Sequence, residues 1–291
     1  MLFTLYVNDL PDVVVTCIPT LYADDLILLS RAKTPRKAIT NLQEDGDRVM
    51  AWCDENRLTL NITKTKYMWF ASYHKLDNTQ DLGIKIKGTD LGEVTEYKYL
   101  GVWLDSELTF KKQLEETHHH VSGKLTQLKL IRYYLNQADA VTLYKQAIVP
   151  ILEYGSFLTD SGPATIVKKY QPLQNRGLRI CTRKRIGEMS TNKLHKTCKV
   201  QRIEVRRNVQ LACLMYKHSK EAENQRPRRH RRTRGDMKVK LNVERPKRTK
   251  YRSGPLYRGM LIWDNLEVHI QEQPDIYQFK TELKKHLKCN V

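Results

Sequence analysis

The run LYADDLILL, from Leu21 to Leu29, sets two adjacent carboxylates between two apolar segments. An apolar run, a short polar break and a second apolar run predict a β-hairpin with Asp24 and Asp25 at its tip. Ordinary turn chemistry is one explanation of the pair, since aspartate favours turns. A metal site is the other, because carboxylates gathered in one cleft need a cation and Mg²⁺ prefers oxygen ligands. Such a site serves phosphoryl or nucleotidyl transfer with two metal ions.

Composition points to a polyanionic partner. The chain has 291 residues and a net charge of +19, enough length for one large domain or two modest ones. Such an excess favours nucleic acid over a membrane, because no apolar run approaches the roughly 20 residues that a membrane span requires. Six scattered cysteines and the absence of a signal-peptide pattern indicate a reducing compartment, so we expect an intracellular protein of the cytoplasm and nucleus.

Regular elements are predicted on both sides of the hairpin. Over residues 1–12, Leu2, Leu5 and Tyr6 share one face of a short amphipathic helix. A longer helix is predicted over 34–56, with Thr34 as N-cap, Pro35 at the first position and an apolar stripe that packs against a sheet. The stripe comprises Ile39, Leu42, Val49, Met50 and Cys53, with Trp52 at its edge. A further hairpin is predicted over 80–105, where Ile84 and Ile86 alternate with lysines.

Beyond residue 107 the pattern becomes helical. Apolar residues recur at spacings of three and four from Phe110 to Ile131, then over 139–153 with Asp139 as cap, then over 164–182. Basic residues line the rest of the third helix: Lys168, Lys169, Arg176, Arg179, Arg183, Lys184 and Arg185. They are either a solvated face or phosphate contacts that read no sequence, and the overall charge favours nucleic acid. The run His118-His119-His120 does not share one helix face, and His195 and Cys198 lack close cysteine pairs, so neither predicts a metal site.

Residues 220–254 are the most polar segment. From Arg226 to Arg252 the chain holds 13 Lys and Arg against 2 Asp and Glu. This density, with its prolines and Gly235, predicts a basic linker without regular structure, which either binds a nucleic-acid backbone, acts as a nuclear import signal or is merely solvated. Order returns over 255–291, where apolar residues from Tyr257 to Leu266 precede a last helix carrying Phe279, Leu283 and Leu287.

Several strings together resemble the reverse transcriptases of non-LTR, jockey-like retrotransposons. They are Leu2-Phe3 with Asn8-Asp9-Leu10-Pro11, the Tyr22-Ala23-Asp24-Asp25 tip, Leu58-Thr59-Leu60-Asn61 with Lys64-Thr65, and Tyr97-Lys98-Tyr99-Leu100-Gly101. The blocks stand in the family's order over 1–105, and the likeness is weaker beyond. The tail, with Tyr257-Arg258-Gly259 and Trp263-Asp264-Asn265-Leu266, is similar to the C-terminal tail of jockey-like elements.

The resemblance implies an α+β fold: a partial palm over 1–105, built of β-hairpins with helices, then a helical thumb-like region over 106–219, the linker 220–254 and the tail 255–291. It implies RNA-directed DNA polymerisation, with an RNA template, a DNA primer, deoxynucleotide triphosphates and Mg²⁺ or Mn²⁺. Asp24 and Asp25 would hold metal, and Tyr22, Ala23, Tyr99, Leu100 and Gly101 would lie near the primer. Lys64 would stabilise the leaving pyrophosphate, although its spacing alone favours an ordinary turn lysine.

One departure from the family limits the expected activity. Family members carry a first metal-binding aspartate on a strand before the helix at 1–9, together with fingers, and this sequence shows neither. Asp9 and Asp12 belong to the Asn-Asp-Leu-Pro string and do not replace it. We therefore expect the chain alone not to polymerise, since loss of one central charge-stabilising group costs about 10²–10³ in rate. The alternative is a catalytically dead retroelement-derived protein that binds RNA or DNA.

Overall fold

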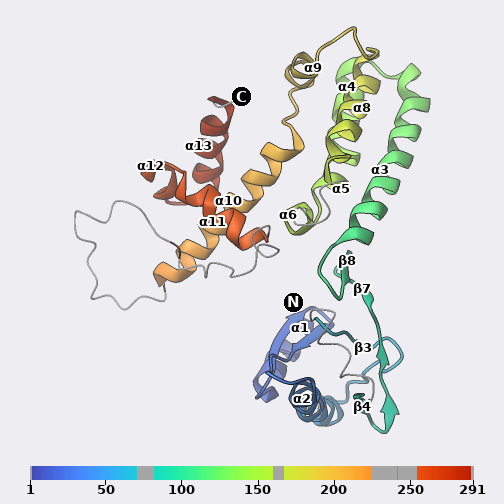
Figure 1. Ribbon diagram of the computed structural model, residues 1–291, viewed down its shortest axis with the longest axis vertical. Coiled ribbons are helices and arrows are strands. Elements are labelled where there is room, and N and C mark those ends of the chain that lie inside the picture. The colour runs from blue at the N-terminus through green and yellow to red at the C-terminus, as the bar shows by residue number, and fades with distance from the viewer. Residues whose placement is uncertain (1, 71–81, 160–166, 225–240, 242–253, 290–291) are drawn as a thin grey trace. The chain divides into compact units, whose positions relative to one another are not determined.

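The computed structural model describes residues 2–70, 82–159, 167–224, 241 and 254–289 (Figure 1). The chain divides into two compact units. The first comprises residues 1–99 with 105–108, and the second comprises residues 100–104 with 109–291. Helices and small two-stranded sheets occur together, which agrees with the α+β class in its coarse form.

The first unit holds most of the short strands and the carboxylate pair. Its elements are α1 (Leu2–Tyr6), η1 (Leu10–Val13), β1 (Ile18–Tyr22), β2 (Asp25–Leu29), α2 (Pro35–Glu55), β3 (Lys66–Tyr67), β4 (Lys85–Ile86), β5 (Thr89–Asp90), β6 (Gly92–Glu93) and β7 (Glu96–Tyr99). β1 and β2 pair antiparallel, as do β4 and β5, while β3 runs parallel to β6. The lysine-flanked Ile84 and Ile86 are buried, as their alternation predicts.

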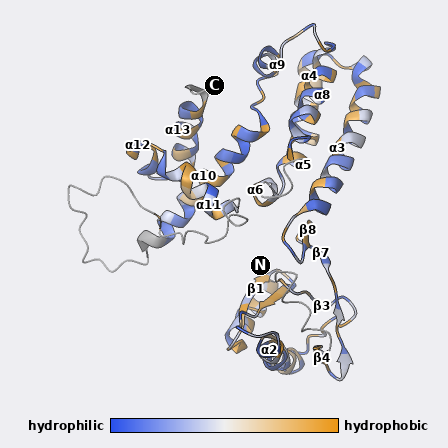
Figure 2. Cartoon of the chain, viewed as in Figure 1, coloured by the Kyte–Doolittle hydropathy of each residue, from blue (hydrophilic) through white to orange (hydrophobic). Residues whose placement is uncertain are grey.

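Helix α2 contributes residues to both apolar clusters of this unit. Its prediction is confirmed: Thr34 caps it by accepting a hydrogen bond from the Lys37 N–H, and Pro35 occupies the first turn. One side of α2 packs with the hairpin through a cluster that includes Val49, Trp52 and Cys53, and the apolar strands β1 and β2 stand out in Figure 2. The other packs with β4 and its neighbours through Ile39 and Met50.

The short helix predicted near the N-terminus is present as α1, but its apolar face is not buried. Leu2, Leu5 and Tyr6 are exposed, whereas Val7 and Leu10 are buried beside Trp52. The physical reason is that α1 ends at Tyr6, so the chain turns and delivers the next two apolar side chains to the core instead. Tyr6 is fixed differently, by a hydrogen bond from its hydroxyl to the Asn56 carbonyl.

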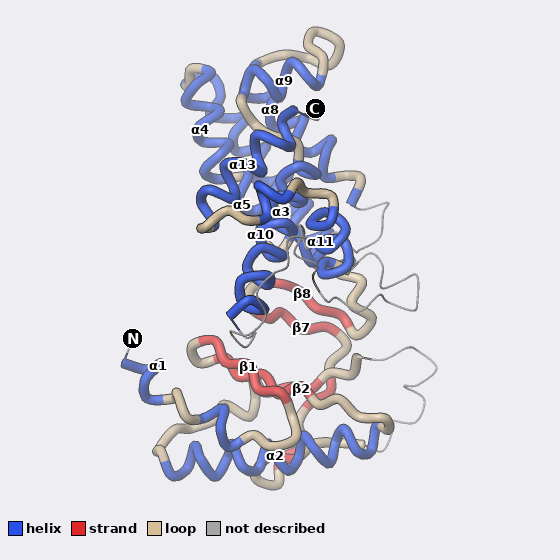
Figure 3. Tube along the Cα trace, turned by 90° about the vertical axis from the view of Figure 1, so that its left-hand side faces the viewer, coloured by secondary structure: helices blue, strands red, loops and turns tan. Residues whose placement is uncertain are grey.

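The described residues of the second unit form helices and one strand, β8 (Val102–Asp105), whose last residue is assigned to the first unit (Figure 3). Its elements are α3 (Lys111–Ile131), η3 (Arg132–Tyr134), α4 (Gln137–Ala147), α5 (Val149–Glu153), α6 (Ser156–Thr159), α8 (Tyr170–Thr182), α9 (Thr191–Cys198), α10 (Ile203–Asn224), α11 (Pro255–Asp264), α12 (Val268–Gln271) and α13 (Ile276–Cys289).

The first helical core gathers α3, α4, α5, α8 and α9. Leu114, Val121, Leu125 and Leu128 are buried at their predicted spacing, but Ile131 is exposed because the chain tightens into η3 there. The predicted helix over 139–153 is two helices, α4 and α5, that meet at Ile148. Its predicted cap is also wrong. Asn136 is the N-cap, and its side chain accepts a hydrogen bond from the Asp139 N–H at 2.9 Å.

The C-terminal helices share a second core with α10. Met215 and Tyr216 of α10 pack with Trp263 of α11 and with Phe279 and Leu283 of α13. Tyr216 and Phe279 stack with their ring centroids 4.6 Å apart. Helix α10 continues to Asn224, into the start of the predicted linker, while residues 226–252 lie outside the described residues except for the buried Leu241. The tail is therefore part of the helical unit's core.

Candidate active site

The carboxylate pair lies at the tip of the β1–β2 hairpin. Tyr22 pairs with Asp25, which leaves Ala23 and Asp24 as a two-residue turn. Ala23 has a φ of 52°, a left-handed conformation that costs a non-glycine residue about 1–2 kcal/mol. Strain of this kind persists only where the surroundings enforce it, and it is concentrated at functional sites. The tip predicted from the sequence is thus a tight, strained turn.

The two faces of the hairpin differ in burial. Leu21, Leu26 and Leu28 pack against the cluster around Trp52. On the opposite face Ile18 and Leu29 are exposed, and Tyr22 is 64% exposed beside Asp25. Both Asp24 and Asp25 are exposed. One face therefore packs on the core while the other presents the Tyr22 ring and the Asp25 carboxylate to solvent, next to the exposed Asp24 of the turn.

The donor set at the tip fits part of a Mg²⁺ site. Among the described residues, neither carboxylate forms an ion pair, so two negative charges stand side by side without a cation. Oxygen donors of this kind are the ligands that Mg²⁺ prefers. In the part of the chain that the structure describes, no three His, Cys, Asp or Glu side chains come together as a metal-binding group. The tip therefore offers two adjacent carboxylate donors, and the described residues place no third donor beside them.

Tyr99, at the end of β7, lies near the tip within the first unit. Its hydroxyl oxygen is buried and has no hydrogen-bond partner among the described residues. Burial, and then the nearby negative charge of Asp25, raise the pKa of Tyr99 above its ordinary value. The tyrosine predicted to lie near the primer thus shares the electrostatic surroundings of one metal-ligand candidate.

Leu100 and Gly101 form the turn that follows Tyr99 and belong to the second unit. Their φ angles are 44° and 79°, and glycine suits the second position because it has no Cβ. A Cβ at Gly101 would lie 3.3 Å from the ring of Tyr154, whose hydroxyl donates a hydrogen bond to the Leu100 carbonyl. The glycine is therefore required by the turn and by Tyr154, in addition to any approach of nucleic acid.

Lys64 sits in an exposed turn. Its N–H donates to the Asn61 carbonyl at 3.2 Å and to the Asn61 side chain at 3.1 Å, and Thr65 donates its hydroxyl to the same carbonyl. The Lys64 side chain is exposed. Within the described residues, no contact connects Lys64 with Asp24 or Asp25. The structure thus gives Lys64 the surroundings of a turn lysine.

The basic residues of the second unit separate into two groups. Lys168, Lys169, Arg176 and Arg185 are exposed, and Lys184 lies 3.9 Å from Glu188. Arg179 and Arg183 instead hold the backbone. Arg179 donates to the Arg185 carbonyl at 2.8 Å, and Arg183 donates to the carbonyls of Arg132 and Tyr133. Arg179 and Arg183 therefore stabilise the backbone at the end of α8, and any phosphate contact would be additional to this structural role.

The histidines do not assemble a metal site among the described residues. His118, His119 and His120 lie consecutively on α3. His195 is buried, and its ring nitrogens lie 2.8 Å from the Val200 carbonyl and 2.9 Å from the Asn175 side-chain oxygen. Burial lowers the pKa of His195, which favours the neutral ring. Its role in the structure is to join α8, α9 and the segment before α10.

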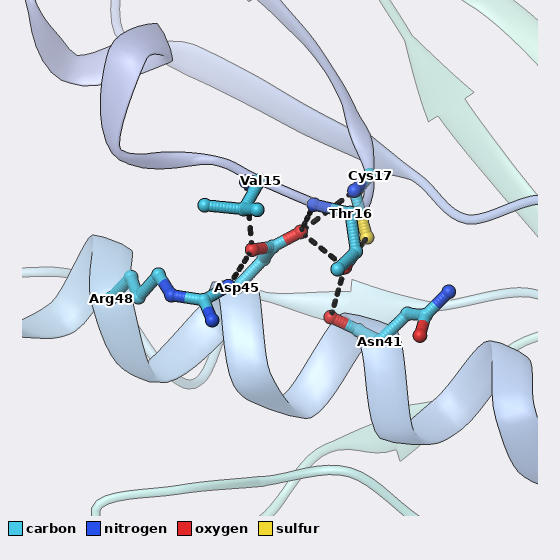
Figure 4. Close-up of polar contacts among 6 residues, drawn as sticks. All are labelled: Val15, Thr16, Cys17, Asn41, Asp45 and Arg48. Carbon is cyan, nitrogen blue, oxygen red and sulfur yellow. Dashed lines mark hydrogen bonds and ion pairs between the residues drawn. The ribbon is translucent and has the colours of Figure 1, made fainter.

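Sequence reasoning missed the residue that fixes the approach to the hairpin. Asp45, in the middle of α2, is 0% exposed. Its carboxylate accepts hydrogen bonds from the N–H groups of Val15, Thr16 and Cys17 at 3.0, 2.9 and 2.7 Å (Figure 4). The Thr16 hydroxyl donates to it as well, at 2.7 Å. These are the last residues before β1, so Asp45 holds the strand that leads to the tip.

The Asp45 carboxylate also has a cation beside it. Arg48, one turn along α2, forms an ion pair with Asp45. Burial by itself raises the pKa of a carboxyl, but the hydrogen bonds from residues 15–17 outweigh it and hold the pKa of Asp45 well below its ordinary value. A sequence signal existed, since Asn41, Asp45, Val49 and Cys53 follow a four-residue spacing and all are buried. A charged residue on a buried stripe is the feature that marks such an anchor.

Comparison with known proteins finds a match over the segment that contains the tip. Residues 1–104 match the family model described as reverse transcriptase (RNA-dependent DNA polymerase). No solved structure matches the chain. In the described residues, no helix has the length and apolar character needed to cross a bilayer.

Three relatives come from fruit flies. A probable RNA-directed DNA polymerase from transposon BS of Drosophila melanogaster is 31% identical over 55% of this chain and 18% of its own length. The RNA-directed DNA polymerase from mobile element jockey of Drosophila funebris is 29% identical over 54% and 17%. A probable RNA-directed DNA polymerase from transposon X-element of Drosophila melanogaster is 25% identical over 62% of this chain and 20% of its own length. The chain thus spans about a fifth of the relatives' length, and its residues 1–104 are similar to reverse transcriptases.

Proposed function

We propose that this chain is a portion of an RNA-directed DNA polymerase of a jockey-like non-LTR retrotransposon. The observation that carries the proposal is the β1–β2 tip, where Asp24 and Asp25 are exposed, adjacent and without a cation among the described residues, inside the segment that matches the family. In finer terms, the first unit is part of a palm and the helices α3 to α10 are a thumb. An RNA template, a DNA primer and deoxynucleotide triphosphates are the proposed partners.

Each residue of the tip has a proposed task. Divalent ions, Mg²⁺ or Mn²⁺, would stabilise the attacking and leaving oxygens of nucleotidyl transfer. Asp24 and Asp25 hold those ions, and the strained turn at Ala23 keeps both carboxylates at the tip. Tyr22 offers an exposed ring beside them to the primer end. Tyr99 of β7 lies near Asp25, and its buried hydroxyl has no hydrogen-bond partner among the described residues.

Catalysis needs a ligand from elsewhere. In the described part of the chain no third carboxylate joins Asp24 and Asp25. A site with fewer charges binds two cations weakly and stabilises the transition state less. We therefore expect polymerisation only when another segment supplies that carboxylate, and no primer extension by the 291 residues alone. Extension on an RNA template that requires Mg²⁺ and disappears with Asp24→Ala would overturn this expectation.

Metal binding at the tip is testable without activity. With Fe²⁺ in place of Mg²⁺, ascorbate and peroxide produce hydroxyl radicals that cut the backbone next to the bound ion. We expect cuts around residues 23–26 that compete away with Mg²⁺ and vanish with Asp24→Asn combined with Asp25→Asn. Asp12→Asn, an exposed carboxylate outside the tip, is the matched control and should leave the cuts unchanged. Cleavage that persists in the double variant would refute the metal assignment.

Nucleic-acid binding without catalysis is the second candidate, favoured by the net charge of +19 and by the exposed Lys168, Lys169, Arg176 and Arg185. A duplex-binding salt series tests it, using the chain beside a variant lacking 226–252. A steep fall of affinity with salt that flattens in the deletion places binding in the basic segment. Unchanged binding places it on the helical surface. Absence of binding by both forms would reject this candidate.

A further inference from the structure

Two adjacent tyrosines stand in solvent at one end of the helical unit. Tyr133 is 81% exposed and Tyr134 is 84% exposed, with ring centroids 5.5 Å apart and planes at 88°. Ile186, in the connection between α8 and α9, is 88% exposed. Single exposed apolar side chains are ordinary, but neighbouring ones mark a surface that binds something. We call Tyr133 and Tyr134 the aromatic end.

The backbone beneath the aromatic end is held by paired arginines. Arg183, at the end of α8, donates to the carbonyls of Arg132 and Tyr133 at 3.0 and 3.1 Å. In return the buried Arg132 donates to the carbonyls of Cys181 and Ile180 at the end of α8. This exchange ties the end of α3 to the end of α8, which lie at the same end of the bundle (Figure 1). The tyrosines are therefore displayed from fixed backbone, which lowers the entropy cost of binding.

The connection that carries Ile186 is fixed as well. Arg179 donates to the Arg185 carbonyl at 2.8 Å and to the Met189 carbonyl at 3.3 Å. The charge around the aromatic end is mostly positive: Lys129, Arg183, Lys184 and Arg185 are exposed there. The acidic neighbours are engaged, since Glu188 faces Lys184 and Asp139 accepts a hydrogen bond from Asn136.

We propose that the aromatic end is a stacking site for an unpaired nucleic-acid strand. Tyr133 and Tyr134 would stack on successive bases, and Arg185 with Lys184 would contact the phosphates between them. Aromatic side chains beside cations are the usual arrangement for single strands, because every base has a π face. A duplex hides its base faces and would use only the cations. The inference rests on the proposed nucleic-acid chemistry of the chain, but not on metal binding or catalysis.

The test separates bases from charge. Binding is measured for a labelled strand of about 12 nucleotides, as RNA and as DNA, beside an abasic strand and a duplex of equal length. Tyr133→Ala with Tyr134→Ala should weaken the base-bearing strands about 5- to 100-fold, the worth of one stacked base or more. Affinity for the abasic strand and the duplex should not change. Tyr133→Phe combined with Tyr134→Phe should keep the affinity of the unsubstituted chain, because both rings remain.

Two controls sharpen the result. Tyr277→Ala removes an equally exposed tyrosine, 79% exposed on α13, and should leave binding of every strand unchanged. Arg185→Ala should weaken all strands alike and reduce the salt slope by about 1. RNA and DNA arms show which strand is preferred, and both outcomes support stacking.

Several outcomes would overturn the proposal. They are equal losses on base-bearing and abasic strands, an equal loss in Tyr277→Ala, or full affinity in the double alanine variant. Vesicles with anionic lipid serve as a further probe. If the double variant lost only vesicle binding, the surface would be a membrane contact instead. Fe²⁺ cleavage near residue 24 is measured on the same variants, so failure of the stacking site and failure of the metal site are distinguishable.

Discussion

Different kinds of contact stabilise the interiors of the two units. The first unit contains the tip and the recognisable strings, yet its apolar clusters are small, and Asp45 ties its central hairpin in place from within. The second unit has few recognisable strings but encloses Leu114, Tyr144, Trp263 and Phe279 completely. The family match ends at residue 104, close to the boundary between them. The recognisable strings thus lie in the unit that carries the carboxylate pair, whereas a packed helical core tolerates many sequences that keep the apolar spacing.

The largest expected effect tests whether apolar packing dominates the second unit. Trp263→Ala removes a fully buried side chain that packs near Phe279, and should lower the free energy of unfolding by about 3–5 kcal/mol. Urea denaturation followed by far-ultraviolet circular dichroism measures it. Tyr277→Ala, on the surface of α13, should stay within about 0.5 kcal/mol. Equal effects of the two changes would contradict the packing described for α10, α11 and α13.

Replacing Asp45 tests the polar anchor of the first unit. In Asp45→Asn the amide keeps one acceptor oxygen, so at least one N–H of residues 15–17 loses its partner. We expect a loss of about 1.5–3 kcal/mol, the worth of a hydrogen bond to a charged group. Hydrogen exchange should accelerate at the amides of Val15, Thr16 and Cys17 and much less in α3. Asp47→Asn, where the exposed carboxylate accepts a hydrogen bond from Gln43 in α2, is the matched control and should leave exchange unchanged.

The same anchor predicts a pH dependence. The pKa of Asp45 in the folded state lies below its ordinary value of 3.8, so the unfolded chain binds the proton more readily. Its contribution to stability is therefore complete above about pH 5 and is lost as the pH falls below about 4 toward the folded pKa. The difference in unfolding free energy between the unsubstituted chain and Asp45→Asn should shrink over that interval. A difference that stays constant down to about pH 3 would show that the charge of Asp45 has no part.

Close helix contact in the second unit predicts a cost for one added carbon. A Cβ at Gly177 of α8 would overlap the ring of Tyr144 and lie 2.9 Å from Leu125. Gly177→Ala should therefore lower stability by about 1–3 kcal/mol despite the better helix propensity of alanine. Gly123→Ala, on α3 with nothing within 4 Å of the new carbon, is the control and should raise stability. A stabilising Gly177→Ala would contradict the packing of α8 against α4.

The smallest change in stability is expected for a glycine in α2. Gly46 follows Asp45 and has open space where a Cβ would stand. Gly46→Ala should raise the unfolding free energy by about 1 kcal/mol, because glycine is the weaker helix former. Hydrogen exchange within α2 should slow correspondingly. Faster exchange at residues 15–17 in this variant would mean that the anchor needs the glycine's freedom.

Local patterns predicted the elements where chemistry and periodicity agree. The polar pair Asp24 and Asp25 between apolar runs indicated the hairpin, and Thr34 with Pro35 indicated the start of α2. The candidate metal ligands followed from a motif. The burial of Asp45 was missed, because its spacing with Val49 and Cys53 marks a buried stripe but does not show that N–H groups of residues 15–17 are there to bind a carboxylate.

Other errors also came from long-range contacts. Arg179 and Arg183 look like ordinary surface cations in a basic run, but they bind carbonyls near residues 132 and 185. The N-cap of α4 is Asn136, one turn before the predicted Asp139. Both residue types are good N-caps because their side chains accept hydrogen bonds from N–H groups, so the sequence alone did not distinguish them. The exposure of Tyr133 and Tyr134 was likewise not predicted, because they follow directly on the apolar pattern of α3. In the structure they lie in η3, where both side chains face solvent.

Helix α10 has a consequence for how the second unit folds. Ile203 at its start belongs to the core of α3 and α8, and Met215 and Tyr216 further along belong to the core of α11 and α13. One continuous helix therefore couples the two clusters, and melting either would expose part of the other's packing surface. We expect cooperative melting across the described residues of this unit. A protein shortened before α11 would leave an apolar face of α10 bare, and a face of that kind drives self-association in solution.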